Sequence, residues 1–211
     1  MKQVLVALMT LAIAPSVNGA IVHGPVEWAI ADDGNGHFYQ LVDYQAGISW
    51  TAARDDAASM TLNGSAGHLV TVTSAEEDAF LKANFESFIG DPNTGVPGIF
   101  AWIGLSDAAN EGSFAWVTGE PFSYSIWAPP EPNDLGGEDY VHLWRRNFGE
   151  GPLWSWNDTN NNPNNPDSPA WTSALVEFDG PFTAVPEPTT AFTWALGGLA
   201  LAIATRRRKK E

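Results

Sequence analysis

The chain has 211 residues, with 25 acidic and 10 basic side chains, a formal net charge of −15 and no cysteine. This length is enough for one domain with its own core, and the acidic excess argues against binding to nucleic acid or to anionic membrane surfaces. Without disulfides, the fold must rely on its core, which can draw on 10 Trp and 11 Phe, or on a bound metal.

The first 20 residues are typical of a secretory signal peptide. Lys2 precedes an apolar run from Val4 to Ala14, and small residues follow through Gly19 and Ala20. The alternative is that this run forms a first core strand or helix. We predict export, with a folded domain over residues 21–182.

The beginning of this domain predicts a hairpin followed by a helix. Val26–Ile30 and His37–Val42 are strand-like, and the Asp-Gly-Asn-Gly sequence at 33–36 supplies the residues of a tight turn. Apolar residues then recur at helical spacing from Trp50 to Met60, with Ser49 as the N-cap. One apolar face predicts that this helix packs on a sheet.

A further strand and a second helix are predicted next. His68–Val72 is a short apolar strand, and Ser74 has Glu77 three residues later, which is the spacing of a capping box. The expected buried face of this helix consists of Phe80, Leu81 and Phe85.

The second half predicts short strands separated by long loops. The strands are expected at Ala101–Leu105, Phe114–Val117, Tyr140–Leu143, Leu153–Trp156 and Ala174–Phe178. Loops are predicted at 90–98 and 127–139, and the Asn- and Pro-rich segment 157–169 is expected to be irregular. The pattern indicates one α+β domain, and loops of this length are usually functional.

Oxygen-bearing side chains cluster at three places in these loops. They are Glu131-Pro132-Asn133, Gly137-Glu138-Asp139 and Trp156-Asn157-Asp158. Calcium takes six to eight oxygen ligands from carboxylates, amide carbonyls and water. The clusters therefore predict a calcium site on loops, with part of its coordination shell open to a ligand.

The C-terminal residues 183–211 form a separate signal. Val185-Pro186-Glu187-Pro188 precedes an apolar stretch over about 190–205, which is short for a membrane span, and a basic cluster at 206–210 ends the chain. This tail resembles the PEP-CTERM sorting signal of Gram-negative bacteria. The resemblance implies an exosortase partner, transient anchoring in the inner membrane, and delivery to the cell surface or extracellular matrix. The alternative is an ordinary C-terminal membrane anchor.

The order of the motifs over about residues 35–180 resembles a C-type lectin-like domain. The matching pieces are Trp50-x-x-Ala53-x-x-x-Ala57, Gly67–Val72, Glu76-Glu77, Trp102-Ile103-Gly104-Leu105, Phe114-x-Trp116-x-x-Gly119, Glu131-Pro132-Asn133, Gly137–Val141, Trp156-Asn157-Asp158 and Val176-Glu177-Phe178. Ala57, Tyr140 and Val176 stand where family members often have cysteine, so the family's disulfides are absent. The resemblance implies the C-type lectin-like fold, with two helices packed on short antiparallel sheets.

The resemblance also implies a principal calcium site that binds carbohydrate directly. Its expected ligands are Glu131, Asn133, Glu138, Asn157 and Asp158. A cis Glu131-Pro132 peptide is expected, and two vicinal sugar hydroxyls would coordinate the ion. In the family, Glu-Pro-Asn accompanies mannose-, glucose-, fucose- or GlcNAc-type ligands. Two alternatives remain: a solvated acidic loop, or a calcium ion that only supports the loop.

An auxiliary calcium site is implied by the same resemblance. Its expected ligands are Asp107, Glu111, Asp134, Glu138 and Asp139. The alternative for residues 107–111 is an ordinary acidic turn.

Two other functions compete with carbohydrate binding. The first is a non-catalytic adhesion or matrix protein that uses a lectin-like fold to bind protein. The second is a glycosidase with Glu131 and Glu138 as its carboxylate pair, which is disfavoured because a metal-bound carboxylate is a poor general acid. The four histidines, His23, His37, His68 and His142, are scattered along the sequence, which argues against a zinc site.

Overall fold

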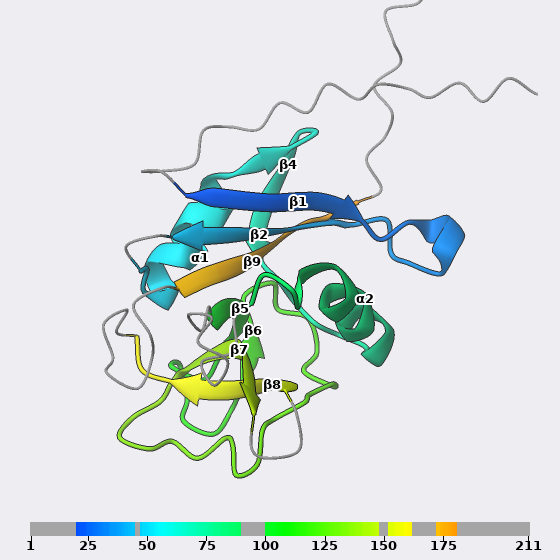
Figure 1. Cartoon of the computed structure of the whole chain (residues 1–211). Coiled ribbons are helices and arrows are strands. Elements are labelled where there is room, and N and C mark those ends of the chain that lie inside the picture. Colours follow the sequence, from blue (N-terminus) through cyan, green and yellow to red (C-terminus); the bar gives the residue numbers. More distant parts are fainter. Residues whose placement is uncertain (1–19, 45–46, 90–99, 148–151, 162–171, 181–211) are drawn as a thin grey trace, which may run out of the picture.

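The computed structural model describes residues 20–44, 47–89, 100–147, 152–161 and 172–180, and over these the chain forms an α+β fold (Figure 1). Its elements are β1 (Ile21–Glu27), the 3-10 helix η2 (Ile30–Asp32), β2 (Phe38–Tyr44), α1 (Trp50–Ser59), β3 (Thr61–Leu62), β4 (Ser65–Leu69), α2 (Ala75–Phe85), β5 (Phe100–Ser106), β6 (Ala115–Trp116), β7 (Tyr140–Asn147), β8 (Pro152–Thr159) and β9 (Thr172–Phe178). The predicted signal peptide up to residue 19, the loop at 90–98 and the C-terminal signal lie outside the described residues.

The last strand of the domain lies in the middle of the sheet. The strand order is β1-β2-β9-β5-β7-β8, with β4 also pairing with β9 and β6 with β5. β9 is antiparallel to β2 and β4 and parallel to β5. β1 therefore forms one edge of the sheet, while β7, β8 and the long loops form the opposite part of the molecule (Figure 1).

Both helices begin at the predicted N-caps. The Ser49 hydroxyl accepts a hydrogen bond from the Ala52 N–H, and the Ser74 hydroxyl accepts one from the Glu77 N–H. The reciprocal bond of the capping box is shifted by one residue, because Glu77 Oε2 accepts from the Thr73 N–H at 2.8 Å. In α2, Leu81 and Phe85 are buried, and Phe80 is partly buried against the same core.

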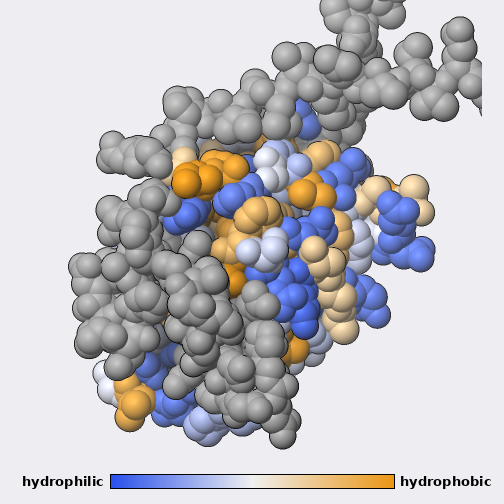
Figure 2. All heavy atoms as spheres, viewed as in Figure 1, coloured by the Kyte–Doolittle hydropathy of each residue, from blue (hydrophilic) through white to orange (hydrophobic). Residues whose placement is uncertain are grey.

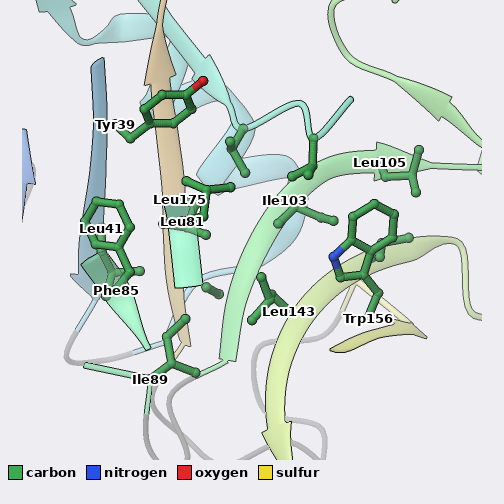
Figure 3. Packing of buried hydrophobic residues seen from close by; sticks show 14 of the residues in the cluster. Tyr39, Leu41, Leu81, Phe85, Ile89, Ile103, Leu105, Leu143, Trp156 and Leu175 are labelled. Atoms are coloured by element: carbon green, nitrogen blue, oxygen red, sulfur yellow. The ribbon is translucent and has the colours of Figure 1, made fainter. Parts of the chain in front are cut away.

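The core is aromatic around β8. Trp156 is fully buried and meets the rings of Trp116, Tyr124 and Trp127 edge-on, with centroids 5.7–6.0 Å apart. Leu105, Ile103 and Leu143 converge on the same region, and the cluster continues to Tyr39 and α2 (Figure 3). Trp156 also fixes the loop that leads to the oxygen-rich cluster. Its backbone N–H donates to the Ile126 carbonyl, and its backbone carbonyl accepts from the Ala128 N–H.

Several predicted boundaries require correction. The first strand ends at Glu27, and η2 occupies Ile30–Asp32, so the first connection is longer than a two-residue hairpin turn. β4 ends at Leu69, although Val70 still donates to Leu175 O. The prediction that 157–169 is irregular is wrong for its first residues, because Asn157 and Asp158 continue β8 opposite His142 and Val141.

Candidate metal and ligand site

The oxygen-rich loop is attached to the sheet through one buried carboxylate. Asp158, near the end of β8, is 1% exposed, and its Oδ2 accepts from the backbone N–H groups of Asn133 at 3.1 Å and Asp134 at 3.0 Å. Hydrogen bonds to a charged acceptor are stronger than neutral ones. Asp158 therefore fixes the loop next to the strand that carries Asn157.

The backbone of the loop has special conformations. The Glu131-Pro132 peptide is cis, which confirms the predicted isomer, and Pro129-Pro130 is cis as well. Asp134 has φ +47°, and Gly136 and Gly137 follow at +86° and +89°. These left-handed residues form the tight turn that lets the side chains of Asn133 and Glu138 reach the same backbone N–H, that of Leu135.

Three of the predicted principal ligands share contacts in this turn. The Asn133 side-chain amide donates to Glu131 Oε2. The Leu135 N–H donates to Asn133 Oδ1 at 2.8 Å and also to Glu138 Oε2 at 3.0 Å, so these two oxygens converge on one hydrogen atom. One stretch of loop, anchored by the Asp158 carboxylate, therefore carries the side-chain oxygens of Glu131, Asn133 and Glu138.

Asn157 is oriented by a different neighbour. Its Nδ2 faces His142 Nε2 at 3.1 Å and also donates to the Asp158 carbonyl. His142 is 3% exposed, and burial lowers its pKa to about 3, so its ring is neutral and Nε2 can accept. In the sequence, His142 is only one of four scattered histidines, and no local pattern marks it. Its place beside Asn157 follows from the register of β7 with β8.

Among the predicted auxiliary ligands, Asp107 is the buried one, and it lies directly after β5. Asp107 is 2% exposed, its Oδ2 accepts from the Gly112 N–H at 2.9 Å, and its backbone N–H donates to Asp139 O at 3.1 Å. Its other oxygen, Oδ1, is buried and has no hydrogen-bond donor among the described residues. A buried carboxylate oxygen without a donor is costly unless a cation or water meets it.

The remaining acidic residues add negative charge to the same region. The pKa of the exposed Glu111 is raised, first by desolvation and then by the negative charges of Asp107, Asp134 and Asp139. Asp134 also accepts the Glu138 N–H at 2.8 Å, which links the two predicted ligand sets. The donor set consists of carboxylate and amide oxygens, which fits calcium, and the orphaned Asp107 oxygen fits a cation.

The architecture defines an α+β domain of the C-type lectin-like class, with an oxygen-rich loop anchored on its sheet. Comparison with known proteins agrees: residues 49–166 match the Lectin C-type domain family, and residues 184–209 match the PEP-CTERM protein-sorting motif. The chain belongs to the C-type lectin domain family, whose fold is typically non-catalytic and whose members generally bind calcium.

Individual relatives cover the same part of the chain. The alpha-N-acetylgalactosamine-specific lectin of Patiria pectinifera is 31% identical over 124 residues, which are 59% of this chain and 67% of that protein. Halomucin of Haloquadratum walsbyi is 30% identical over 130 residues, which are 54% of this chain but only 1% of that protein. A solved structure of the EPNH mutant of CEL-I is 27% identical, with a TM-score of 0.52 over 69% of this chain and 90% of its own.

The sorting motif indicates an exported protein with transient membrane attachment. Within the part of the chain that the structure describes, no helix has the length and apolar character needed to cross a bilayer. The apolar stretch over about 190–205 lies outside that part.

Proposed function

We propose that this domain binds carbohydrate through a calcium ion held by Glu131, Asn133, Glu138, Asn157 and Asp158. The observation that carries the proposal is the convergence of Asn133 Oδ1 and Glu138 Oε2 on the Leu135 N–H, in a loop tied to the Asp158 carboxylate. Asn157 stands next to Asp158 on β8, and a hydrogen bond from its Nδ2 to neutral His142 leaves its Oδ1 as the oxygen available to a cation. The family generally binds calcium and lectin relatives support a sugar ligand.

The ion would supply two open coordination positions for vicinal sugar hydroxyls. Each hydroxyl would donate to a carboxylate such as Glu131 or Glu138 and accept from an amide such as Asn133 or Asn157. Asn133 is exposed and Glu131 is half-buried, so both side chains can reach a ligand. A single sugar held by a few charged hydrogen bonds, each contributing about 1.5–3 kcal/mol, should bind weakly, so useful avidity requires several copies.

We expect the site to prefer mannose-, glucose-, fucose- or GlcNAc-type sugars. The basis is the order of acid and amide in Glu131-Pro132-Asn133, which sets the direction of the hydrogen bonds. A competing ligand class comes from the Patiria pectinifera relative, whose name specifies alpha-N-acetylgalactosamine. Both classes therefore belong in any binding test.

A second calcium ion is proposed at Asp107, Glu111, Asp134, Glu138 and Asp139. The orphaned Asp107 Oδ1 supports it, since a cation there would satisfy a buried oxygen that has no donor among the described residues. This ion would sit behind the sugar-binding loop and support it, because Asp134 and Glu138 belong to both regions.

The test is the double substitution Glu131→Gln with Asn133→Asp, which exchanges acid and amide without changing the net charge. The double variant should lose binding to mannose-type sugars in millimolar calcium. The matched control is Glu27→Gln with Asn63→Asp, which makes the same chemical changes at two exposed positions outside the loop. If sugar preference and calcium affinity are the same in both double variants and in the unaltered protein, the proposed site is wrong.

We propose that an exosortase recognises the C-terminal signal, and that the lectin domain is delivered to the cell surface or matrix. The match over residues 184–209 supports this proposal. Replacing Pro186 and Pro188 by alanine should keep the full-length chain in the inner-membrane fraction. Unchanged delivery of the variant would contradict it.

A further inference from the structure

Two histidines that are far apart in sequence flank one end of the central strand. In the pairing of β4 with β9, His68 stands opposite Glu177. The other side of β9 pairs with β2, and His37 directly precedes β2. Asp179 directly follows β9. Glu177 and Asp179 are two residues apart, so their side chains share a face at the end of the strand. The separation of the histidines in sequence therefore does not persist in the fold.

The side-chain atoms of this cluster lie close together. The nearest contact joins His37 Nδ1 to Glu177 Oε1 at 2.6 Å, and His37 Nδ1 lies 3.7 Å from Asp179 Oδ1. One ligand atom from each of His37, Glu177 and Asp179 lies within 4.8 Å of the other two. His68 Nε2 approaches the same Asp179 oxygen at 3.2 Å.

These separations match the ligand spacing of a tetrahedral metal site. Zinc binds histidine nitrogen and carboxylate oxygen at about 2.0–2.2 Å, which places neighbouring ligand atoms about 3.4 Å apart. The measured separations of 2.6, 3.2 and 3.7 Å lie on both sides of this value. His37, Glu177 and Asp179 already form a group, and the His68 ring must turn further to join them.

The two ring nitrogens of His68 have different partners. Nδ1 lies 2.9 Å from the Leu69 carbonyl, which can only accept, so Nδ1 carries a proton. Nε2 lies 3.2 Å from Asp179 Oδ1 and is therefore the nitrogen placed to share a ligand position with that carboxylate.

The carboxylates are held in place before any metal arrives. Glu177 is 3% exposed, and it accepts the Thr71 N–H at 3.0 Å and the Tyr39 hydroxyl at 3.2 Å. Asp179 is followed by Gly180, where a Cβ would lie only 2.0 Å from the Gly36 carbonyl oxygen. That backbone contact fixes Asp179 beside His37, and the 65% exposure of its side chain leaves an entry route from solvent.

The geometry points to a zinc-class metal site with His37 Nδ1, Glu177 and Asp179 as ligands and His68 Nε2 as the fourth. Imidazole nitrogens favour zinc over calcium, which binds oxygen ligands. The ion would cross-link β2, β4 and the end of β9 in a domain that contains no cysteine. This inference does not rest on sugar binding.

The test is a zinc titration of the purified full chain, stripped with EDTA and then held in about 10 mM calcium to fill the oxygen sites. Competition with a chromophoric chelator should give one zinc per chain, and zinc should raise the midpoint of thermal unfolding. Replacement by cobalt should give the visible absorption of a tetrahedral site with nitrogen and oxygen ligands.

Two ligand variants and two matched controls locate the ion. Asp179→Asn and His37→Ala should each weaken zinc binding by at least about tenfold. Asp55→Asn is the control for the first, because its side chain is similarly exposed at 69%. His23→Ala is the control for the second, because His23 stacks on Phe88 away from the cluster.

Either of two results would overturn the inference. One is the absence of zinc binding by the unaltered chain at concentrations up to about 1 mM, far above the range of structural zinc sites. The other is one bound zinc that Asp179→Asn leaves unaffected, which would place the ion elsewhere. Since Asp179 is exposed, its variant remains informative even if His37→Ala fails to fold.

Discussion

The substitution Asp158→Asn separates the structural role of this carboxylate from its proposed role in calcium binding. Asp158 accepts from two backbone N–H groups of the loop, at Asn133 and Asp134. Asparagine keeps one oxygen but directs an NH2 group at one of these donors. Losing one hydrogen bond to a charged acceptor should lower the free energy of unfolding by about 1.5–3 kcal/mol.

Calcium adds a second, separable effect. Extracellular calcium modules have dissociation constants of about 10⁻⁴–10⁻³ M. In about 10 mM calcium, each filled site should therefore raise the free energy of unfolding by about 1.4–2.7 kcal/mol. With a urea slope of about 2 kcal/mol per M, this shifts the unfolding midpoint by about 0.7–1.4 M. Asp158→Asn should lose the share of this gain that comes from the principal site.

The assay is urea unfolding followed by tryptophan fluorescence, in calcium and in EDTA. Asp32→Asn removes the same charge at an exposed position in η2 and serves as the control, with the full calcium-dependent gain expected. The reasoning is refuted if Asp158→Asn shows the same calcium-dependent gain as the control. It is also refuted if calcium stabilises neither protein.

Three further predictions concern the scaffold that supports the site. Trp156→Ala should lower the free energy of unfolding by about 3–5 kcal/mol in urea denaturation, because the ring is fully buried among other aromatic rings. Gly104→Ala should cost about 1–3 kcal/mol in the same assay, because a Cβ would lie 2.7 Å from the Leu69 carbonyl oxygen. Burial raises the pKa of Asp78, so its ionisation destabilises the folded state progressively as the pH rises above the carboxyl's unfolded pKa. Asp78→Asn keeps an acceptor for the Trp154 indole N–H without the charge, so its stability should fall less than that of the unaltered protein between about pH 4 and pH 7.

Much of the scaffold could be predicted because its signals are local. Ser49 and Ser74 cap their helices as expected, since an N-cap depends on a few neighbouring residues. The strand ends were harder to place, because they depend on partners distant in sequence. Asn157 and Asp158 look like loop residues in sequence, yet pairing with β7 keeps them in β8.

The candidate site shows the same division between local and long-range signals. The Glu131-Pro132-Asn133 motif and the resemblance around it nominate its candidate residues, which stay a prediction. The roles of His142 beside Asn157 and of Asp158 as the anchor of the loop require the register of β7 and β8. The grouping of His37 with Glu177 and Asp179 depends on β9 entering the sheet beside β2, which no local pattern indicates.

One large hydrophobic side chain is strongly exposed beside the candidate site. On the face drawn in Figure 2, hydrophobic and hydrophilic residues of the described part are intermixed. Among the described residues, the most exposed large hydrophobic side chain is Leu135, at 79%, and it lies in the oxygen-rich loop itself. A ligand bound there would meet an apolar side chain next to the charged oxygens.

The most direct measurement is glycan-array binding by the purified protein in millimolar calcium and again in EDTA. We predict signals on mannose- or fucose-type glycans that disappear in EDTA and in the Glu131→Gln, Asn133→Asp double variant. Silence in both conditions from a protein shown to be folded would contradict calcium-dependent sugar binding and favour a protein-binding role. Signals that persist in EDTA would contradict the role of the calcium site, and signals confined to N-acetylgalactosamine would contradict the predicted specificity.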